Sequence, residues 1–189
     1  MARRAVFLDR DGVINNHGDY INHPDDMLLI DGSAAAIRRL NEAGLPVVVI
    51  TNQGGIAMGF ITEEDLKRIH RRMDDLLAAE DAHVDAIYYC PFHPKGTVPA
   101  YRKVSPLRKP GMGMIELARD EHDIDLAASY FVGDMTGDIL AGQRAGCRTV
   151  LVATGFGGSD GEHEAEPDLR ADDLPEAVGL ILKETALID

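Results

Sequence analysis

The sequence predicts an α/β fold in which a mostly parallel sheet lies between two layers of helices. Short apolar runs alternate with amphipathic segments, as they do in successive strand–helix–strand units. Polar and glycine-containing clusters follow several of these runs, as expected for loops at the carboxyl edge of a parallel sheet. The 189 residues suffice for one buried core and contain no internal repeat or dividing linker. Residues 1–189 are therefore predicted to form a single domain.

The strands are predicted from apolar runs that polar residues bound. They cover residues 5–9, 46–51, 84–89, 129–133 and 148–152. The run PVVVIT at 46–51 shows no alternation, which is typical of a strand covered by helices on both faces.

Helices are predicted between the strands, at residues 33–43, 62–77, 113–121, 138–145 and 174–184. Gly44 marks the end of the first of them. Thr62 and Asp65 form a capping box at the start of the second, with Asp in place of the usual Glu. Residues 91–110 and 154–167 are predicted to be loops, and loops this long are often functional.

Charge and composition exclude several classes of protein. The net charge of −13 and the lack of a basic stripe disfavour binding to nucleic acid, including a nucleic-acid 3′-phosphatase activity. The apolar runs are far shorter than the roughly 20 residues needed to span a membrane. Two cysteines and no apolar leader favour a cytoplasmic protein. We expect a monomer that binds neither membranes nor nucleic acid.

Four polar clusters are predicted to converge. Asp9-Arg10-Asp11-Gly12 follows the first strand, residues 51–55 (TNQGG) follow the second, and residues 133–138 (GDMTGD) follow the fourth. Residues 108–110 (RKP) precede the helix that leads into the fourth strand. Because ligands bind outside the carboxyl ends of parallel strands, these clusters define a candidate site. Singly, each has an ordinary explanation as a turn, a solvated charge or a helix cap, and their agreement in position is what favours a function.

The residue types at this edge suit phosphoryl transfer. Asp9 is the candidate nucleophile, and Asp11 would protonate the leaving oxygen and later activate water. Thr51 and the Asn52 N–H would hold phosphoryl oxygens, while Lys109 would neutralise developing charge.

The same edge offers a magnesium site. Carboxylates of Asp9 and Asp134, with the backbone carbonyl of Asp11, are the hard oxygen ligands that Mg²⁺ prefers. Asp138 is predicted to lie behind them and to orient a metal-bound water or Lys109.

Residues 7–15 (FLDRDGVIN), 51–53 (TNQ), 108–110 (RKP) and 132–138 (VGDMTGD) resemble the four motifs of the haloacid dehalogenase (HAD) superfamily of phosphohydrolases. Residues 18–20 (GDY), 88–96 and 128–134 are similar to its branch of heptose bisphosphate and histidinol phosphate phosphatases. The resemblance spans about residues 5–155. It implies a three-layer Rossmann-like core with minimal or no cap domain, Mg²⁺, and an aspartyl-phosphate intermediate on Asp9.

Without a cap, selectivity comes from the loops around the pocket. The resemblance implies a small phosphorylated sugar as substrate, with heptose 1,7-bisphosphate as the first candidate and histidinol phosphate or another small phosphomonoester as the alternative. A non-catalytic phosphate-binding protein is disfavoured because the four central residues Asp9, Asp11, Lys109 and Asp134 are intact. The substrate contacts that it implies are Arg10, His17, Gly18, Asp19, Tyr20, Asn52, Gln53, Gly54 and Arg108.

The chain departs from the family at two places. Relatives usually hold a structural zinc in the long loop, bound by a cysteine and a histidine early in the loop and by two cysteines just before the RKP motif. Here Cys90 and nearby His93 remain, but Ser105 and Leu107 replace the two later cysteines. Two soft ligands cannot close a tetrahedral site, so zinc is not expected. Met135 stands where relatives often have a lysine that contacts substrate, which weakens the case for the heptose. The histidines His17, His23, His70, His83, His122 and His163 are interpreted as surface or loop residues.

Overall fold

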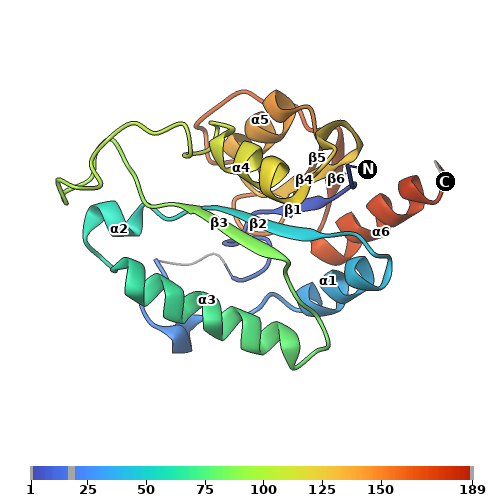
Figure 1. Cartoon of the computed structure of the whole chain (residues 1–189), viewed down its shortest axis with the longest axis horizontal. Coiled ribbons are helices and arrows are strands. Elements are labelled where there is room, and N and C mark those ends of the chain that lie inside the picture. Colours follow the sequence, from blue (N-terminus) through green and yellow to red (C-terminus); the bar gives the residue numbers. More distant parts are fainter. Residues whose placement is uncertain (1, 17–19, 188–189) are drawn as a thin grey trace.

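The computed structural model describes residues 2–16 and 20–187, which form three layers with helices on both faces of one sheet (Figure 1). The sheet has six strands in the order β3-β2-β1-β4-β5-β6, and each neighbouring pair is parallel. The predicted α/β fold is therefore confirmed. The strands are β1 (Val6–Leu8), β2 (Val47–Asn52), β3 (Ala86–Cys90), β4 (Tyr130–Gly133), β5 (Arg148–Val152) and β6 (Leu169–Ala171).

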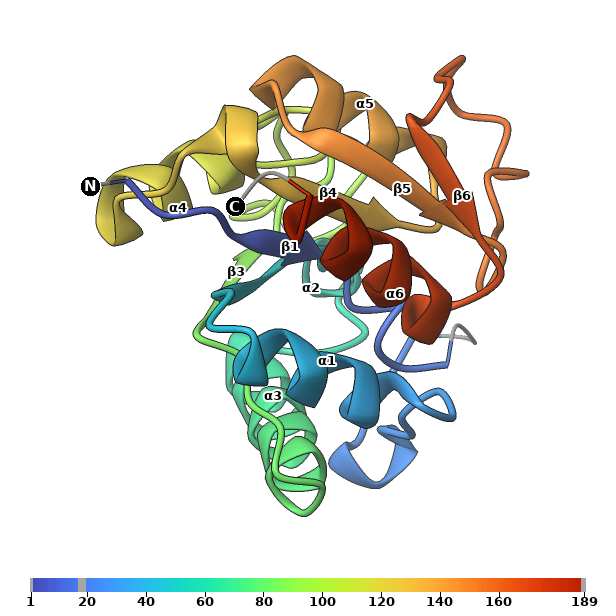
Figure 2. The same ribbon diagram turned by 90° about the vertical axis from the view of Figure 1, so that its right-hand side faces the viewer.

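Two groups of helices enclose the sheet. The helices α1 (Ser33–Glu42), α3 (Glu63–Ala78) and α6 (Leu174–Thr185) cover one face. The helices α4 (Gly113–His122) and α5 (Thr136–Ala145) cover the other. Figure 2 shows α1 and α6 packed side by side on the first face. No helix in the ranges that the structure describes is long and apolar enough to cross a bilayer.

The core lies on both sides of β1, because successive residues of a strand point to opposite faces of the sheet. Leu8 belongs to the same buried cluster as Ile37 of α1 and Ile69 of α3, whereas Phe7 belongs to the cluster that contains Ile115 of α4. Burial on both faces explains why the central strands are apolar throughout, as the 46–51 run predicted.

The capping box of α3 forms as predicted. Thr62 Oγ1 accepts a hydrogen bond from the Asp65 N–H at 3.1 Å, and Asp65 Oδ2 accepts one from the Thr62 N–H at 2.9 Å. Between β1 and α1, the described part of the chain forms only one helical element, the 3-10 helix η1 (Pro24–Asp26), in keeping with a minimal cap.

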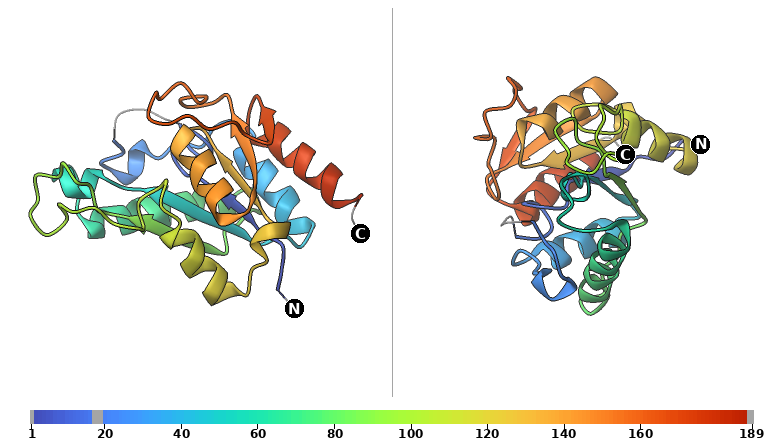
Figure 3. Two further views of the ribbon diagram at one scale, coloured as in Figure 1. Left: turned by 90° about the horizontal axis from the view of Figure 1, so that it is seen from above. Right: turned by 90° about the vertical axis from the view of Figure 1, so that its left-hand side faces the viewer.

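Four short elements were not predicted from the sequence, namely the 3-10 helices η1 and η2 (Leu126–Ala128), a helix after β2 and a strand at the sheet edge. The helix α2 (Gly55–Met58) follows β2 directly, and the 91–110 loop lies beside it in two views (Figures 1 and 3). The Val98 N–H donates to the Ala57 carbonyl at 2.9 Å, which fixes this contact. Strand β6 pairs with β5 at the sheet edge. All four elements are too short to produce a hydrophobic period.

Candidate active site

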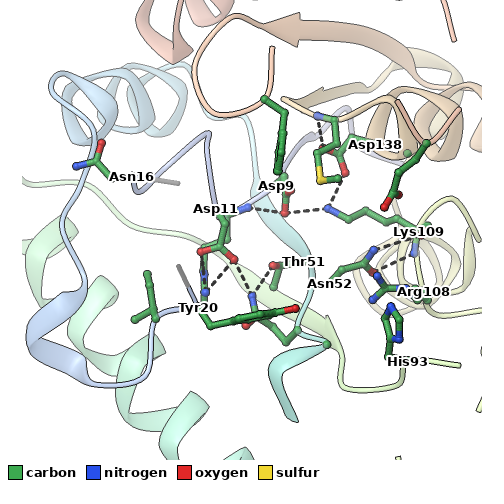
Figure 4. A pocket seen from close by; sticks show the side chains of 18 residues that line it. Asp9, Asp11, Asn16, Tyr20, Thr51, Asn52, His93, Arg108, Lys109 and Asp138 are labelled. Carbon is green, nitrogen blue, oxygen red and sulfur yellow. Dashed lines mark hydrogen bonds and ion pairs between the residues drawn. The ribbon is translucent and has the colours of Figure 1, made fainter. Parts of the chain in front are cut away.

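The carboxyl edge of the sheet brings the predicted site residues together around a cavity of about 410 Å³. Asp9 and Asp11 reach it from the end of β1, Thr51 from β2, and Lys109 from the long loop (Figure 4). Asp138 enters from the first turn of α5. A cavity of this size suits a small-molecule ligand.

Lys109 links these elements through its ammonium group. Its Nζ lies 2.8 Å from Asp9 Oδ1 and 2.7 Å from Asp138 Oδ1, and it donates to the Ile50 carbonyl at 2.8 Å. All three charged side chains are buried. Burial alone would lower the pKa of Lys109, but the carboxylates of Asp138 and Asp9 outweigh it and raise that pKa. The lysine is therefore cationic at every physiological pH.

Asp134 lies at the end of β4 with its side chain fully buried. Its Oδ2 accepts a hydrogen bond from the Phe156 N–H at 2.8 Å, and its Oδ1 has no partner among the described residues. Carboxylate oxygens of Asp9, Asp134 and Asp138 all lie within 4.8 Å of one another. Burial raises the pKa of both Asp9 and Asp134, and the charge of Asp9 adds to the shift at Asp134.

Gly12 allows the turn after β1 to pass close to this carboxylate. Its φ is +85°, and a Cβ atom there would collide with the side chain of Asp134. Only glycine combines this left-handed backbone with so close an approach.

Asp11 is held by three side chains. Arg10 Nη2 donates to both of its carboxylate oxygens at 2.8 and 2.9 Å, Asn15 Nδ2 donates at 3.0 Å, and Gln53 Nε2 donates at 2.9 Å. Burial would raise the pKa of Asp11, but the Arg10 charge and these hydrogen bonds lower it. In the resting cavity Asp11 is consequently ionised. Gln53 Nε2 also donates to Thr51 Oγ1 at 2.8 Å.

The predicted substrate contacts divide into three groups. Arg108, Gly54 and Tyr20 line the cavity, and the Tyr20 ring lies 4.9 Å from that of Phe60. Asn52 also lines the cavity, but its side chain binds the backbone of Lys109, with its Oδ1 accepting from the Lys109 N–H at 3.0 Å. Arg10 is bound to Asp11 as described. His17, Gly18 and Asp19 lie outside the described residues.

Several residues of the cavity wall were not singled out from the sequence. Phe156 comes from the glycine-rich segment after β5, so the strand-end rule could have found it. Glu162 lies farther along the same loop, which a hydrogen bond from Thr136 N–H to Asp160 Oδ2 at 2.6 Å ties to α5. No pattern in the sequence indicates Glu162. The others are Asn16 and Ile21, together with His93, which the sequence indicated only as a remnant of a zinc site.

The long loop is held by aromatic contacts where relatives are expected to bind zinc. Cys90 is buried, and its Sγ lies 3.7 Å from the Phe92 carbonyl. Lys103 Nζ lies 3.9 Å from the centre of the Phe92 ring, which packs 6.1 Å from the Tyr101 ring. Among the described residues, one group of three side chains could hold a metal ion, and it consists of Asp9, Asp134 and Asp138. Cys90 is not part of it. That this loop binds no zinc stays a prediction from its two soft ligands.

A parallel α/β sheet with a buried lysine–aspartate cluster at its carboxyl edge, behind an Asp-x-Asp turn, defines a phosphohydrolase of the HAD type. Residues 106–177 match the family model described as HAD-hydrolase-like. The chain is 43% identical over 186 residues to a D-glycero-D-manno-heptose-1,7-bisphosphate 7-phosphatase of Thermosynechococcus vestitus, covering 94% of this chain and 95% of the relative. The D-glycero-beta-D-manno-heptose-1,7-bisphosphate 7-phosphatase of Escherichia coli K12 is 47% identical over 152 residues, or 80% of each chain.

A solved structure is similar over almost the whole chain. The D,D-heptose 1,7-bisphosphate phosphatase of B. bronchiseptica, complexed with magnesium and phosphate, superposes with a TM-score of 0.86 at 35% identity, covering 96% of this chain and 99% of the other. The chain belongs to the family of these heptose bisphosphate phosphatases, and it is a phosphatase.

The loop contacts lead to a prediction about metal content. Protein purified without added metal should contain no stoichiometric zinc, because Ser105 and Leu107 stand where two of the four ligands would be needed. Elemental analysis, with thermal unfolding before and after treatment with a strong chelator, checks this. The melting temperature is expected to change by less than about 2 °C, since no folding free energy comes from zinc. One zinc per chain, lost together with stability, would contradict the prediction.

Proposed function

We propose that this phosphatase hydrolyses a small phosphorylated sugar in two steps, through an aspartyl-phosphate on Asp9, with Mg²⁺ as cofactor. The observation that carries the proposal is the position of Asp9 at the cavity floor, 2.8 Å from the buried Lys109 ammonium and close to the buried Asp134. A carboxylate fixed beside a permanent cation can attack a phosphoryl group whose negative charge would otherwise repel it.

The aspartate cluster fits a magnesium ion. Asp134 Oδ1 is a buried carboxylate oxygen without a partner in the described structure, and burial raises the pKa of Asp9 and Asp134. A hard dication bound there would give the unpaired oxygen a partner and would offset the cost of burying the two negative charges. Asp9, Asp134 and the Asp11 carbonyl would hold it, and when bound it would screen charge on the phosphoryl oxygens. The relative complexed with magnesium and phosphate supports this assignment.

Asp138 has a different role in the proposal. One of its oxygens contacts Lys109 Nζ at 2.7 Å, and the other accepts the Met135 N–H at 3.1 Å. Both oxygens are thus engaged within the protein. In this proposal Asp138 positions Lys109, which is one of the two roles suggested from the sequence, the other being to orient a metal-bound water.

In the first step, an Asp9 oxygen bonds to phosphorus as the bond from phosphorus to the leaving sugar oxygen breaks. Asp11 gives its proton to that oxygen. Because Asp11 is ionised in the resting cavity, it takes up this proton when the phosphate dianion enters beside it and raises its pKa. Thr51 and the Asn52 N–H bind phosphoryl oxygens. In the second step water attacks phosphorus, the bond to Asp9 breaks, and Asp11 recovers a proton from the water.

The substrate we propose is heptose 1,7-bisphosphate, cleaved at the 7-phosphate, as the names of the relatives indicate. Arg108 supports a second phosphate site, because its buried Nη1 has no partner among the described residues and a guanidinium pairs well with phosphate. The second candidate is a small monophosphate such as histidinol phosphate. Met135 and Glu162 favour it, because they line the cavity and leave it less cationic than a lysine at position 135 would. The monomeric state and the cytoplasmic location stay predictions.

The nucleophile is tested by Asp9→Asn. Turnover should fall more than about 10³-fold, because the amide cannot form the covalent intermediate. Exposed Asp31→Asn serves as the control and should keep wild-type kinetics, while thermal unfolding verifies that both variants fold. Asp9→Asn protein that retains a tenth of the activity would remove Asp9 as nucleophile.

The magnesium site predicts a pH-dependent affinity. The raised pKa values of Asp9 and Asp134 mean that these carboxyls hold protons at higher pH than free aspartate, and Mg²⁺ must displace them. Affinity should therefore fall as the pH falls through the neutral range, with proton release visible by calorimetry in buffers of different ionisation enthalpy. Asp134→Asn should abolish the binding. An affinity that ignores pH, with no proton release, would argue against this cluster as the site.

The substrate is tested by steady-state kinetics on both candidates. We expect kcat/KM for heptose 1,7-bisphosphate to exceed that for histidinol phosphate by about tenfold or more, a difference of about 1.4 kcal/mol. Arg108→Met should remove most of this preference and leave the monophosphate unaffected. Equal or better turnover of histidinol phosphate would reject the first candidate in favour of the second.

A further inference from the structure

His93 lines the active-site cavity next to Arg108. A Cβ atom on Gly54 would lie 3.4 Å from Arg108 Nη1 and 3.5 Å from His93 Cδ2, so both side chains reach the same point beside this glycine. Figure 4 shows the two side chains together at one end of the cavity, away from Asp9. Because Gly54 has no side chain, the point that they share stays open to a ligand.

The backbone of His93 is held on both sides. Its N–H donates to the Tyr101 carbonyl at 3.2 Å, and its carbonyl accepts from the Gly96 N–H at 3.0 Å. The next residue along, Thr97, donates from Oγ1 to the Met58 carbonyl at the end of α2, at 2.8 Å. The turn that carries the ring is therefore tied to α2 beside the cavity.

The loop uses one nitrogen of the ring and leaves the other for the cavity. Nδ1 of His93 accepts a hydrogen bond from the Lys95 N–H at 3.1 Å. A neutral imidazole that accepts at Nδ1 carries its proton on Nε2, which is then a donor. Nε2 makes no hydrogen bond with a described residue. It is bonded to Cδ2, the ring atom closest to the open point at Gly54, so the donor edge of the ring faces the ligand side.

The charges around this point favour an anion. Arg108 Nη1 is a buried donor without a partner in the described structure. Burial, and then the charges of Arg108 and Lys95, lower the pKa of His93, which keeps the imidazole neutral and Nε2 protonated. Glu162 acts on the ring in the opposite sense and more weakly than either cation. A phosphate oxygen accepts hydrogen bonds from both guanidinium and imidazole N–H groups, so a phosphate group fits this end of the cavity.

We propose that His93 determines specificity by donating a hydrogen bond from Nε2 to the non-reacting phosphate of the substrate, beside Arg108 Nη1. The phosphate to be cleaved lies at Asp9, so this end of the cavity takes the group at the other end of the sugar. The inference rests on the proposed function, because it needs a substrate with two phosphates. It makes His93 a substrate-binding residue, whereas the resemblance to relatives would make it a zinc ligand.

The role predicts a change in substrate binding and none in the chemical step. A bond to the distal phosphate is made equally in the bound substrate and in the transition state, so its loss raises KM and leaves kcat unchanged. The same heptose with only the 7-phosphate has no group to place there and should be insensitive. Damage to the loop would instead disturb Lys109, which the same loop carries, and would lower kcat for both substrates.

The experiment measures steady-state kinetics with heptose 1,7-bisphosphate and with heptose 7-phosphate. In His93→Phe, which keeps a ring but has no donor, we expect KM for the bisphosphate to rise about tenfold or more and kcat to stay within about twofold. Both constants for the monophosphate should stay within about twofold. His93→Gln, whose side-chain amide can donate, should recover most of the loss. His83→Phe, at an exposed histidine, is the matched control and should change neither substrate.

Three results would overturn the inference. A rise in KM of equal size for both substrates, or a fall in kcat, would show a structural role for the ring. Unchanged constants in His93→Phe would show that the ring does not reach the phosphate. One zinc per chain that is lost in His93→Phe would assign the ring to a metal ion.

The wild type and Arg108→Met separate this inference from the proposed function. If wild-type protein does not prefer the bisphosphate to the monophosphate, the proposed substrate is wrong and the inference falls with it. If the wild type has this preference, and Arg108→Met removes it while His93→Phe keeps it, only the inference about His93 fails.

Discussion

The ammonium group of Lys109 lies between the carboxylates of Asp9 and Asp138 with almost no access to solvent. Three buried charges are tolerated only as a hydrogen-bonded set, because removing one partner leaves the others uncompensated. The set joins β1, α5 and the 91–110 loop at one point. The positions of the other site residues therefore depend on it: the loop that carries Arg108 is tethered there, and so is the turn that carries Asp11.

Hydrogen bonds and aromatic contacts also tie the long loop to the rest of the chain. Asn52 binds the backbone of Lys109 at one end, and the Phe92–Lys103–Tyr101 contacts hold the middle. Tyr101 Oη in turn donates to Glu63 Oε1 at 2.8 Å, which ties the loop to the start of α3. These contacts help to hold Arg108 and Lys109 at the cavity.

The strand-end residues were predictable because parallel strands present their carboxyl ends at one edge, so Asp9, Thr51 and Asp134 had to meet there. Residues such as Glu162 were not, because the path of a loop rich in glycine depends on tertiary contacts such as that of Asp160 with Thr136. Strand β6 was not predicted because it has only three residues, one of them the exposed Arg170, and so short a run shows no hydrophobic period. His70 was misread because a polar residue on an apolar helix face is recognised as buried only when its partner is known.

The central claim is that Asp9 accepts the phosphoryl group while Asp134 helps to hold the metal. Beryllofluoride mimics the phosphoryl group of an acyl-phosphate, so a crystal structure determined with Mg²⁺ and beryllofluoride tests both parts at once. The account predicts beryllium bonded to a carboxylate oxygen of Asp9, with Mg²⁺ in contact with Asp9 and Asp134 and the Lys109 ammonium beside the fluorides. Beryllofluoride bound to another residue, or a metal ion bound away from Asp134, would contradict it.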